Sequence, residues 1–171
     1  MSRDAIRDCH QWLEATLADV SAEQAQWIPP GVANPIAAVY AHVIVGADVA
    51  VHLLLQGGQP LIATRANAGL SELMPVSDWH TWARRVQIDL TQFRAYADDV
   101  YAAWYRYLDA LGESDLARTV DLSIWGMGQR TLDQFLLIQV EHFSCHIGEI
   151  ACLKGLQGAV GFRPGTAEGI G

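Results

Sequence analysis

The sequence TLDQFLLIQVEHFSCHIGEI, residues 131–150, predicts a long helix with a capped start. Thr131 and Gln134 have the spacing of a capping box, in which each side chain bonds to the backbone N–H of the other residue. We expect the helix to end at about Leu153, because Gly155 is the first of several glycines in the C-terminal residues. This helix is the last one that the sequence predicts.

Two histidines, His142 and His146, lie in this helix. They are four residues apart and therefore project from one face, about one turn from each other. The same face carries Phe135, Ile138, Cys145, Glu149 and Leu153. We therefore expect both imidazoles to point into the interior, where they can bind one metal ion. The pair alone is also typical of core histidines that hydrogen-bond to a neighbour, so it needs support from elsewhere in the chain.

That support comes from His42, in an apolar segment predicted to be helical from Pro35 to about Gln56. Its face of the helix carries Ala38, Val45, Gly46, Val49 and Leu53. A lone histidine on such a face is more often a satisfied core residue. Three inward histidines from two helices, however, match a three-imidazole site with open positions, which is the arrangement of catalytic metal centres. Gly46, one turn beyond His42, would let another group approach closely.

The other three histidines are interpreted as non-ligands. His52 is ten residues from His42, which places it on a different face of the helix. His10 and His80 lie beside charged residues that are typical of a surface.

Glu149 and Cys145 lie beside the predicted ligands. Glu149 has three open roles: it orients an imidazole, it acts as a base on metal-bound water, or it is a capping or solvent-facing residue. Cys145 has no obvious activating cation, and we interpret it as a small core residue beside the ligands with no part in the chemistry.

Two common kinds of helical metal site are excluded by spacing. A di-iron carboxylate bundle needs two Glu-x-x-His motifs, and the chain has none. A zincin needs His-Glu-x-x-His, but Phe143 follows His142.

Apolar residues spaced three or four apart predict four long helices, over about residues 6–20, 35–56, 93–111 and 131–153. Residues 57–76 have little periodicity and several glycines and prolines, which predicts a long connection between the second and third helices. No strand-like alternation of useful length is present. We therefore predict an all-α protein, an antiparallel four-helix bundle. Residues 1–171 form one domain, of which about 155–171 are a glycine-rich tail.

The composition is that of a folded, acidic protein. The chain has 171 residues, of which 51% are hydrophobic and 18% charged, and this excludes disorder of the whole chain. The formal net charge is -8, and the cationic residues form no run longer than Arg84-Arg85, so a nucleic-acid partner is not expected. Three cysteines without a C-x-x-C spacing fit a reducing cytoplasm rather than a disulfide framework.

No membrane association is expected either. The N-terminal residues alternate charges where a secretory signal would have its apolar part. The segment Ile36 to Leu55 is apolar enough to resemble a membrane span, but it carries His42, Asp48 and His52. An Asp at the centre of a membrane helix costs about 2.5 to 3.5 kcal/mol for insertion, so we predict a buried core helix.

Several of these segments together resemble the DinB-like, or YfiT-like, family of four-helix metal-binding proteins. The segment NPIAAVYAHV, which ends at Val43 and carries His42, is similar to that family's second helix with its first metal ligand. The segment that contains His142, His146 and Glu149 is similar to its last helix with the other two ligands. Residues 96–108 and 152–158 resemble a bacterial subgroup of the family.

The resemblance implies an antiparallel bundle, often a homodimer, that holds one divalent ion such as zinc or nickel on His42, His142 and His146. It also implies a small-molecule substrate. Characterised members include transferases and isomerases that use low-molecular-weight thiols such as bacillithiol or mycothiol. No motif for a thiol cofactor is visible in this chain.

Three functions follow as hypotheses. The first is a metal-dependent enzyme, in which the ion acts as a Lewis acid toward a thiol or water, for thiol transfer or isomerisation or for hydrolysis. The second is a non-catalytic metal- or small-ligand-binding protein of a stress response. The third is a helical interaction module without metal, in which the histidines are core residues.

Overall fold

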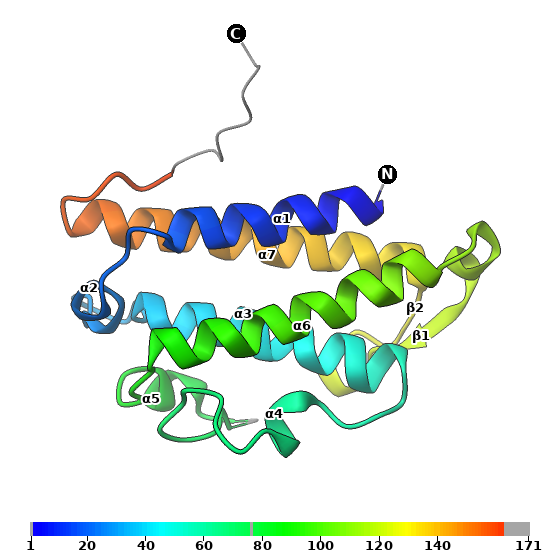
Figure 1. The fold of residues 1–171 in the computed structure, drawn as a ribbon, viewed down its shortest axis with the longest axis horizontal. Helices are drawn as coiled ribbons and strands as arrows, with labels where there is room; N and C mark the ends of the chain where they lie inside the picture. The colour runs from blue at the N-terminus through cyan, green and yellow to red at the C-terminus, as the bar shows by residue number, and fades with distance from the viewer. Residues whose placement is uncertain (1, 76, 163–171) are drawn as a thin grey trace, which may run out of the picture.

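The structure is a computed structural model that describes residues 2–75 and 77–162. Most of the described chain is helical, as the periodicity predicts. The four long helices, shown in Figure 1, are α1 (Ser2–Leu17), α3 (Ile36–Asp48), α6 (Leu90–Ala110) and α7 (Leu132–Leu156). Part of the predicted tail, residues 163–171, lies outside the described residues, and Gly155 belongs to α7.

The helices form two parallel pairs that run in opposite directions. Cys9 of α1 lies beside Ser144 of α7, and Thr16, further along α1, contacts Lys154, further along α7, so these two helices run the same way. Figure 1 shows α3 and α6 both running the other way. The prediction of an antiparallel bundle is therefore corrected: α3 opposes α7, but α1 and α7 are parallel. The reason is the long connection over 56–89, which returns along the bundle before α6 begins.

Short elements occupy the connections. Ser21 forms a capping box at the start of α2 (Ala22–Gln26), and α4 (Leu61–Thr64) and α5 (Trp79–Ala83) lie in the connection before α6. Between α6 and α7 the chain forms the 3-10 helix η2 (Glu113–Ala117), strand β1 (Thr119–Asp121), the 3-10 helix η3 (Ser123–Trp125) and strand β2 (Gln129–Thr131). The two strands pair antiparallel. This small hairpin adds two strands to the predicted all-α fold; at three residues each, they are too short for an alternation of useful length to be visible in the sequence.

The α3 helix continues into a π-helical turn, η1 (Val49–Leu55), at a buried carboxylate. Asp48 is fully buried and accepts hydrogen bonds from the backbone N–H groups of Leu61 and Ile62, at 2.9 and 2.8 Å. It also accepts from the Tyr96 hydroxyl at 2.7 Å and from His52 Nδ1 at 2.7 Å. One side chain therefore joins α3, α4, α6 and η1.

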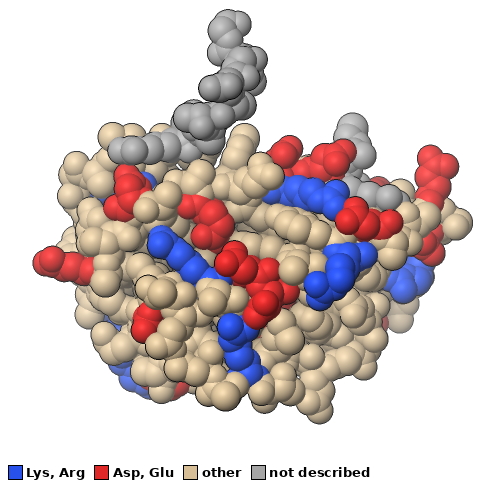
Figure 2. Space-filling view, viewed as in Figure 1, with Lys and Arg blue, Asp and Glu red and all other residues tan. Residues whose placement is uncertain are grey.

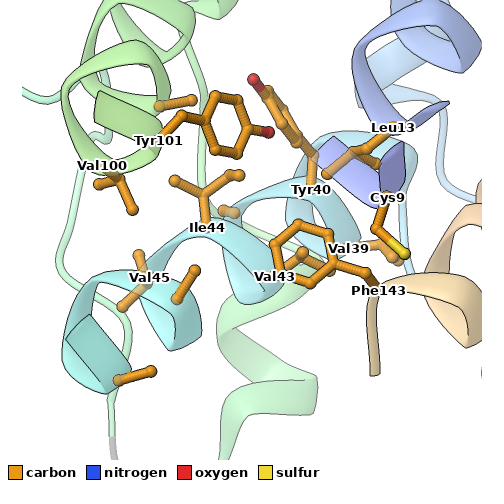
Figure 3. Packing of buried hydrophobic residues seen from close by; sticks show 14 of the residues in the cluster. Cys9, Leu13, Val39, Tyr40, Val43, Ile44, Val45, Val100, Tyr101 and Phe143 are labelled. Atoms are coloured by element: carbon orange, nitrogen blue, oxygen red, sulfur yellow. The ribbon is translucent and has the colours of Figure 1, made fainter. Parts of the chain in front are cut away.

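The core lies between the four long helices. Leu13 of α1, Ile44 of α3, Tyr101 of α6 and Phe143 of α7 are all buried, and Figure 3 shows their side chains gathered together. The segment Ile36–Leu55 is long and apolar enough to span a membrane by length and composition, but 67% of its most apolar part is buried inside the protein. This burial is what a core helix requires, as the sequence predicts.

A buried ammonium group links the parallel pair α1 and α7. Lys154, the only lysine of the chain, is 2% exposed. Its Nζ donates to the carbonyl oxygen of Thr16 at 2.7 Å and to Oδ1 of Asp19 at 2.5 Å. The helix is thereby held to α1 close to its C-terminal end.

The surface charges are mixed in sign. Figure 2 shows arginine side chains next to acidic ones on the viewed face, without an extended basic area. Ion pairs such as Arg7 with Asp109 and Arg85 with Glu72 fit this pattern.

His10 is not at the surface, contrary to its interpretation from neighbouring charges. It is 1% exposed, stacks on Tyr101 with ring centroids 4.3 Å apart, and contacts Phe143 with centroids 4.8 Å apart. Neither ring nitrogen has a hydrogen-bond partner within the described residues. Burial, with a smaller effect of the nearby Arg7 charge, lowers the pKa of His10 from 6.5 to about 3.

The buried His10 predicts a specific loss of stability in acid. Between pH 6.5 and 3 the unfolded chain binds a proton at this residue and the folded chain does not, so the free energy of unfolding falls as the pH falls through this window. Replacing His10 by Phe removes this contribution. We expect the free energy of unfolding of His10→Phe, relative to wild type, to rise by about 2 kcal/mol between pH 7 and pH 5 in urea titrations. A relative stability that is the same at both pH values would contradict the burial of a neutral His10.

Candidate metal centre

Two helices bring the three predicted histidines together. His42 comes from α3, and His142 and His146 come from neighbouring turns of α7, which runs antiparallel to α3. One nitrogen of each ring lies within 4.8 Å of the others, and the Nε2 atoms of His42 and His142 are 3.1 Å apart. All three rings meet edge to face, with centroids 4.7 to 5.1 Å apart.

This arrangement fits a divalent metal ion. Two imidazole nitrogens bound to tetrahedral zinc at about 2.0 to 2.1 Å are roughly 3.3 Å from each other, close to the separation of His42 and His142. Burial and the neighbouring imidazoles lower the pKa of His142 from 6.5 to about 3, and burial also lowers the pKa of His42. Both rings are therefore neutral at pH 7, which is the state that binds metal.

Glu149 contacts the third histidine. Its Oε2 is 2.8 Å from Nδ1 of His146, one turn away on α7. Because a carboxylate only accepts, His146 donates through Nδ1, and the lone pair of the neutral ring is then on Nε2. Of the three roles open in the sequence, this contact favours the orientation of an imidazole.

An aromatic side chain covers His42. Trp79, at the start of α5, stacks on the His42 ring with centroids 5.1 Å apart and an interplanar angle of 23°. The residue before it, Asp78, has a φ of 60°, a left-handed conformation that is uncommon outside glycine. The connection before α6 therefore approaches the three histidines, which its sequence did not indicate.

A cavity of about 330 Å³ opens beside the histidines. Its wall contains His42 and His142 and the residues Gly46, Val49, Met74, Trp125, Met127, Ile138 and Gln139. Gly46 lies beside the His142 ring: a Cβ atom added to it would be 3.7 Å from His142 Cε1, an ordinary van der Waals contact.

The remaining candidates lie outside the cluster. His52 is bonded to Asp48, His80 is exposed, and Cys145 is exposed on α7. The interpretation of His52 and His80 as non-ligands agrees with these positions. Cys145 is not a core residue, because α7 turns this side chain toward solvent.

Sequence reasoning missed the cavity wall. Met74 and Met127 come from irregular segments and Trp125 from the three-residue helix η3, where no periodicity indicates which way a side chain points. Gln139, three residues before His142, was detectable as a polar residue on the histidine face of the last helix.

Comparison with known proteins identifies the family. The family model of the DinB superfamily matches residues 5–150, which include the three histidines and Glu149. A crystal structure of the conserved protein of a locus from Enterococcus faecalis has the same fold, with a TM-score of 0.74 and 20% sequence identity over 91% of this chain and 94% of that chain. None of the curated proteins matches. The family predicted from the histidine segments is thus confirmed, and the chain belongs to the DinB superfamily.

Proposed function

We propose that the protein is a metal-dependent enzyme in which His42, His142 and His146 hold one divalent ion beside a substrate cavity. The observation that carries the proposal is the position of His42 and His142, whose nitrogens are 3.1 Å apart and whose rings form part of the wall of a cavity of about 330 Å³. Three imidazole donors suit zinc or nickel.

Each part of the site has a separate task. A bound divalent ion would supply Lewis acidity, which lowers the pKa of a thiol or of water. The Glu149 carboxylate holds the proton on Nδ1 of His146 and so presents Nε2 as the donor atom. The mostly apolar cavity wall holds the substrate next to His42 and His142 and limits its contact with water.

We propose a low-molecular-weight thiol as the second reactant. The test is a conjugation assay with zinc- or nickel-loaded protein, with bacillithiol or mycothiol as the thiol and 1-chloro-2,4-dinitrobenzene as the electrophile. We expect conjugation that needs the metal. Turnover of 4-nitrophenyl acetate without any thiol would instead favour a hydrolase, and metal-loaded protein that is inert in both assays would leave the binding role.

Glu149 offers a test of the geometry at the metal. Replacing it by Gln removes the carboxylate that fixes the proton of His146, and we expect the affinity for zinc to fall by about 10- to 100-fold. Competition with a chromophoric chelator measures this loss. Glu141→Gln is the matched control, because Glu141 is exposed on the same helix. Equal zinc affinities for the two variants would rule out an orienting role for Glu149.

The assembly and location of the protein stay predictions. We propose a cytoplasmic homodimer that acts on a small molecule, without nucleic-acid or membrane partners. Sedimentation equilibrium of the metal-loaded protein measures the oligomeric state.

A further inference from the structure

The cavity beside the histidines has an unusually uniform wall. Apart from the two imidazoles, its lining side chains are aliphatic, thioether or aromatic, with a single exception, the amide of Gln139. No Lys, Arg, Asp or Glu is among the described residues that line it. In the metal-free protein a charged ligand group would find no counterion among the described residues of this wall, and its desolvation would go uncompensated there.

Gln139 is the one side chain of the described wall that can both donate and accept a hydrogen bond and that the metal site does not explain; the indole N–H of Trp125 can only donate. It is 4% exposed, and its side chain has no hydrogen-bond partner among the described residues. Its amide atoms are not among the fully buried, unpartnered side-chain atoms of the described residues, so the amide is accessible from the cavity that it lines, where a ligand can hydrogen-bond to it. Its position on α7, three residues before His142, places it on the same face as that histidine.

The size of the cavity limits what can bind. An engineered cavity of roughly 150 Å³ in another protein takes one benzene ring, so about 330 Å³ has room for roughly two such rings. Met74 and Met127 supply flexible thioether side chains that adapt to different shapes, and Trp125 supplies a flat aromatic surface.

We propose that this cavity binds a neutral, largely apolar molecule of one or two rings, and that Gln139 selects it by hydrogen-bonding to a carbonyl or hydroxyl group. The amide can serve either group, because it donates through its NH₂ and accepts through its oxygen. That this molecule is the substrate rests on the proposed function. Its selection by Gln139 rests on the structure of the cavity alone.

The test compares two ligands in protein freed of metal by chelation. Acetophenone has a carbonyl group, and ethylbenzene has nearly the same shape without it. Ligand-observed NMR titration gives the Kd of each for wild type, for Gln139→Leu and for Gln11→Leu, an exposed control on α1. We expect Gln139→Leu to weaken acetophenone binding by about three- to tenfold and to leave ethylbenzene binding equal or tighter. Gln11→Leu should change neither.

Other outcomes overturn the inference. Equal effects of Gln139→Leu on both ligands would show that the amide does not select, and tighter binding of benzoate than of acetophenone would show that the wall does not exclude charge. Circular dichroism of each variant verifies that it is folded, and Gln139→Glu provides a second variant, for which we expect weaker acetophenone binding as well. Zinc content is measured on the same preparations before chelation. If the protein contains no zinc but Gln139 still selects acetophenone over ethylbenzene, only the metal-dependent function is refuted. If the protein contains zinc but Gln139 does not select between the two ligands, only this inference is refuted.

Discussion

We expect the replacement of His142 by Ala to abolish metal binding, with the ion content falling from the proposed one per chain in wild type to nearly none. Three protein donors are the minimum for most catalytic zinc sites, and two imidazoles on separate helices hold an ion weakly. The His142 ring lies against both other histidines, as each of the three rings does, with centroids 5.1 Å from His42 and 4.7 Å from His146. Elemental analysis of untagged protein measures the effect.

The three histidine variants are not expected to be equivalent. The metal content of His42→Ala should equal that of His142→Ala, because both rings face the cavity. His146→Ala should retain some metal, since it frees the Glu149 carboxylate, whose oxygen atoms can bind the ion. His80→Ala is the control and should keep the full metal content, because His80 is exposed and outside the cluster. A full complement of metal in His142→Ala would refute the three-histidine site.

Replacing Asp48 by Ala should strongly destabilise the fold. It leaves the N–H groups of Leu61 and Ile62, the Tyr96 hydroxyl and the His52 ring without their acceptor in a buried place. Truncating one partner of such a buried charged network costs roughly 3 to 5 kcal/mol. This is a large part of the total stability of a domain, which is about 5 to 15 kcal/mol.

Urea unfolding followed by circular dichroism measures this loss. Asp48→Asn should lie between wild type and Asp48→Ala, because it keeps one carbonyl oxygen but turns an NH₂ group toward donors. Asp98→Ala, at an exposed position of α6, should stay within about 0.5 kcal/mol of wild type. A loss of less than about 1 kcal/mol in Asp48→Ala would show that water or a rearrangement satisfies these donors.

Regular local patterns made the helices and the three histidines predictable. The capping box at Thr131 is present in the structure, and the spacing of His142 and His146 fixes their common face whatever the rest of the chain does. His42 was recognisable because it interrupts an apolar face. These features depend on the geometry of one helix at a time.

Features that depend on contacts between segments were not predictable. The direction of α6 relative to α3 follows from the course of the connection over 56–89, which has no periodic pattern. His10 was placed at the surface because its sequence neighbours are charged, although the helix turns its own side chain toward Tyr101. The sequence also did not reveal that Asp48 meets Leu61, Ile62 and Tyr96, since these partners lie 13 to 48 residues away.

Because the side chain of Lys154 is buried between α1 and α7, the separation of these two helices can be measured by mass spectrometry. While α1 and α7 stay together, the ε-amino group is enclosed with Thr16 and Asp19 and is out of reach of acylating reagents. Modification at residue 154 then requires the two helices to separate, and its rate reports how often they do. Because the chain contains no second lysine, peptide mapping would assign every acylated lysine to this single event.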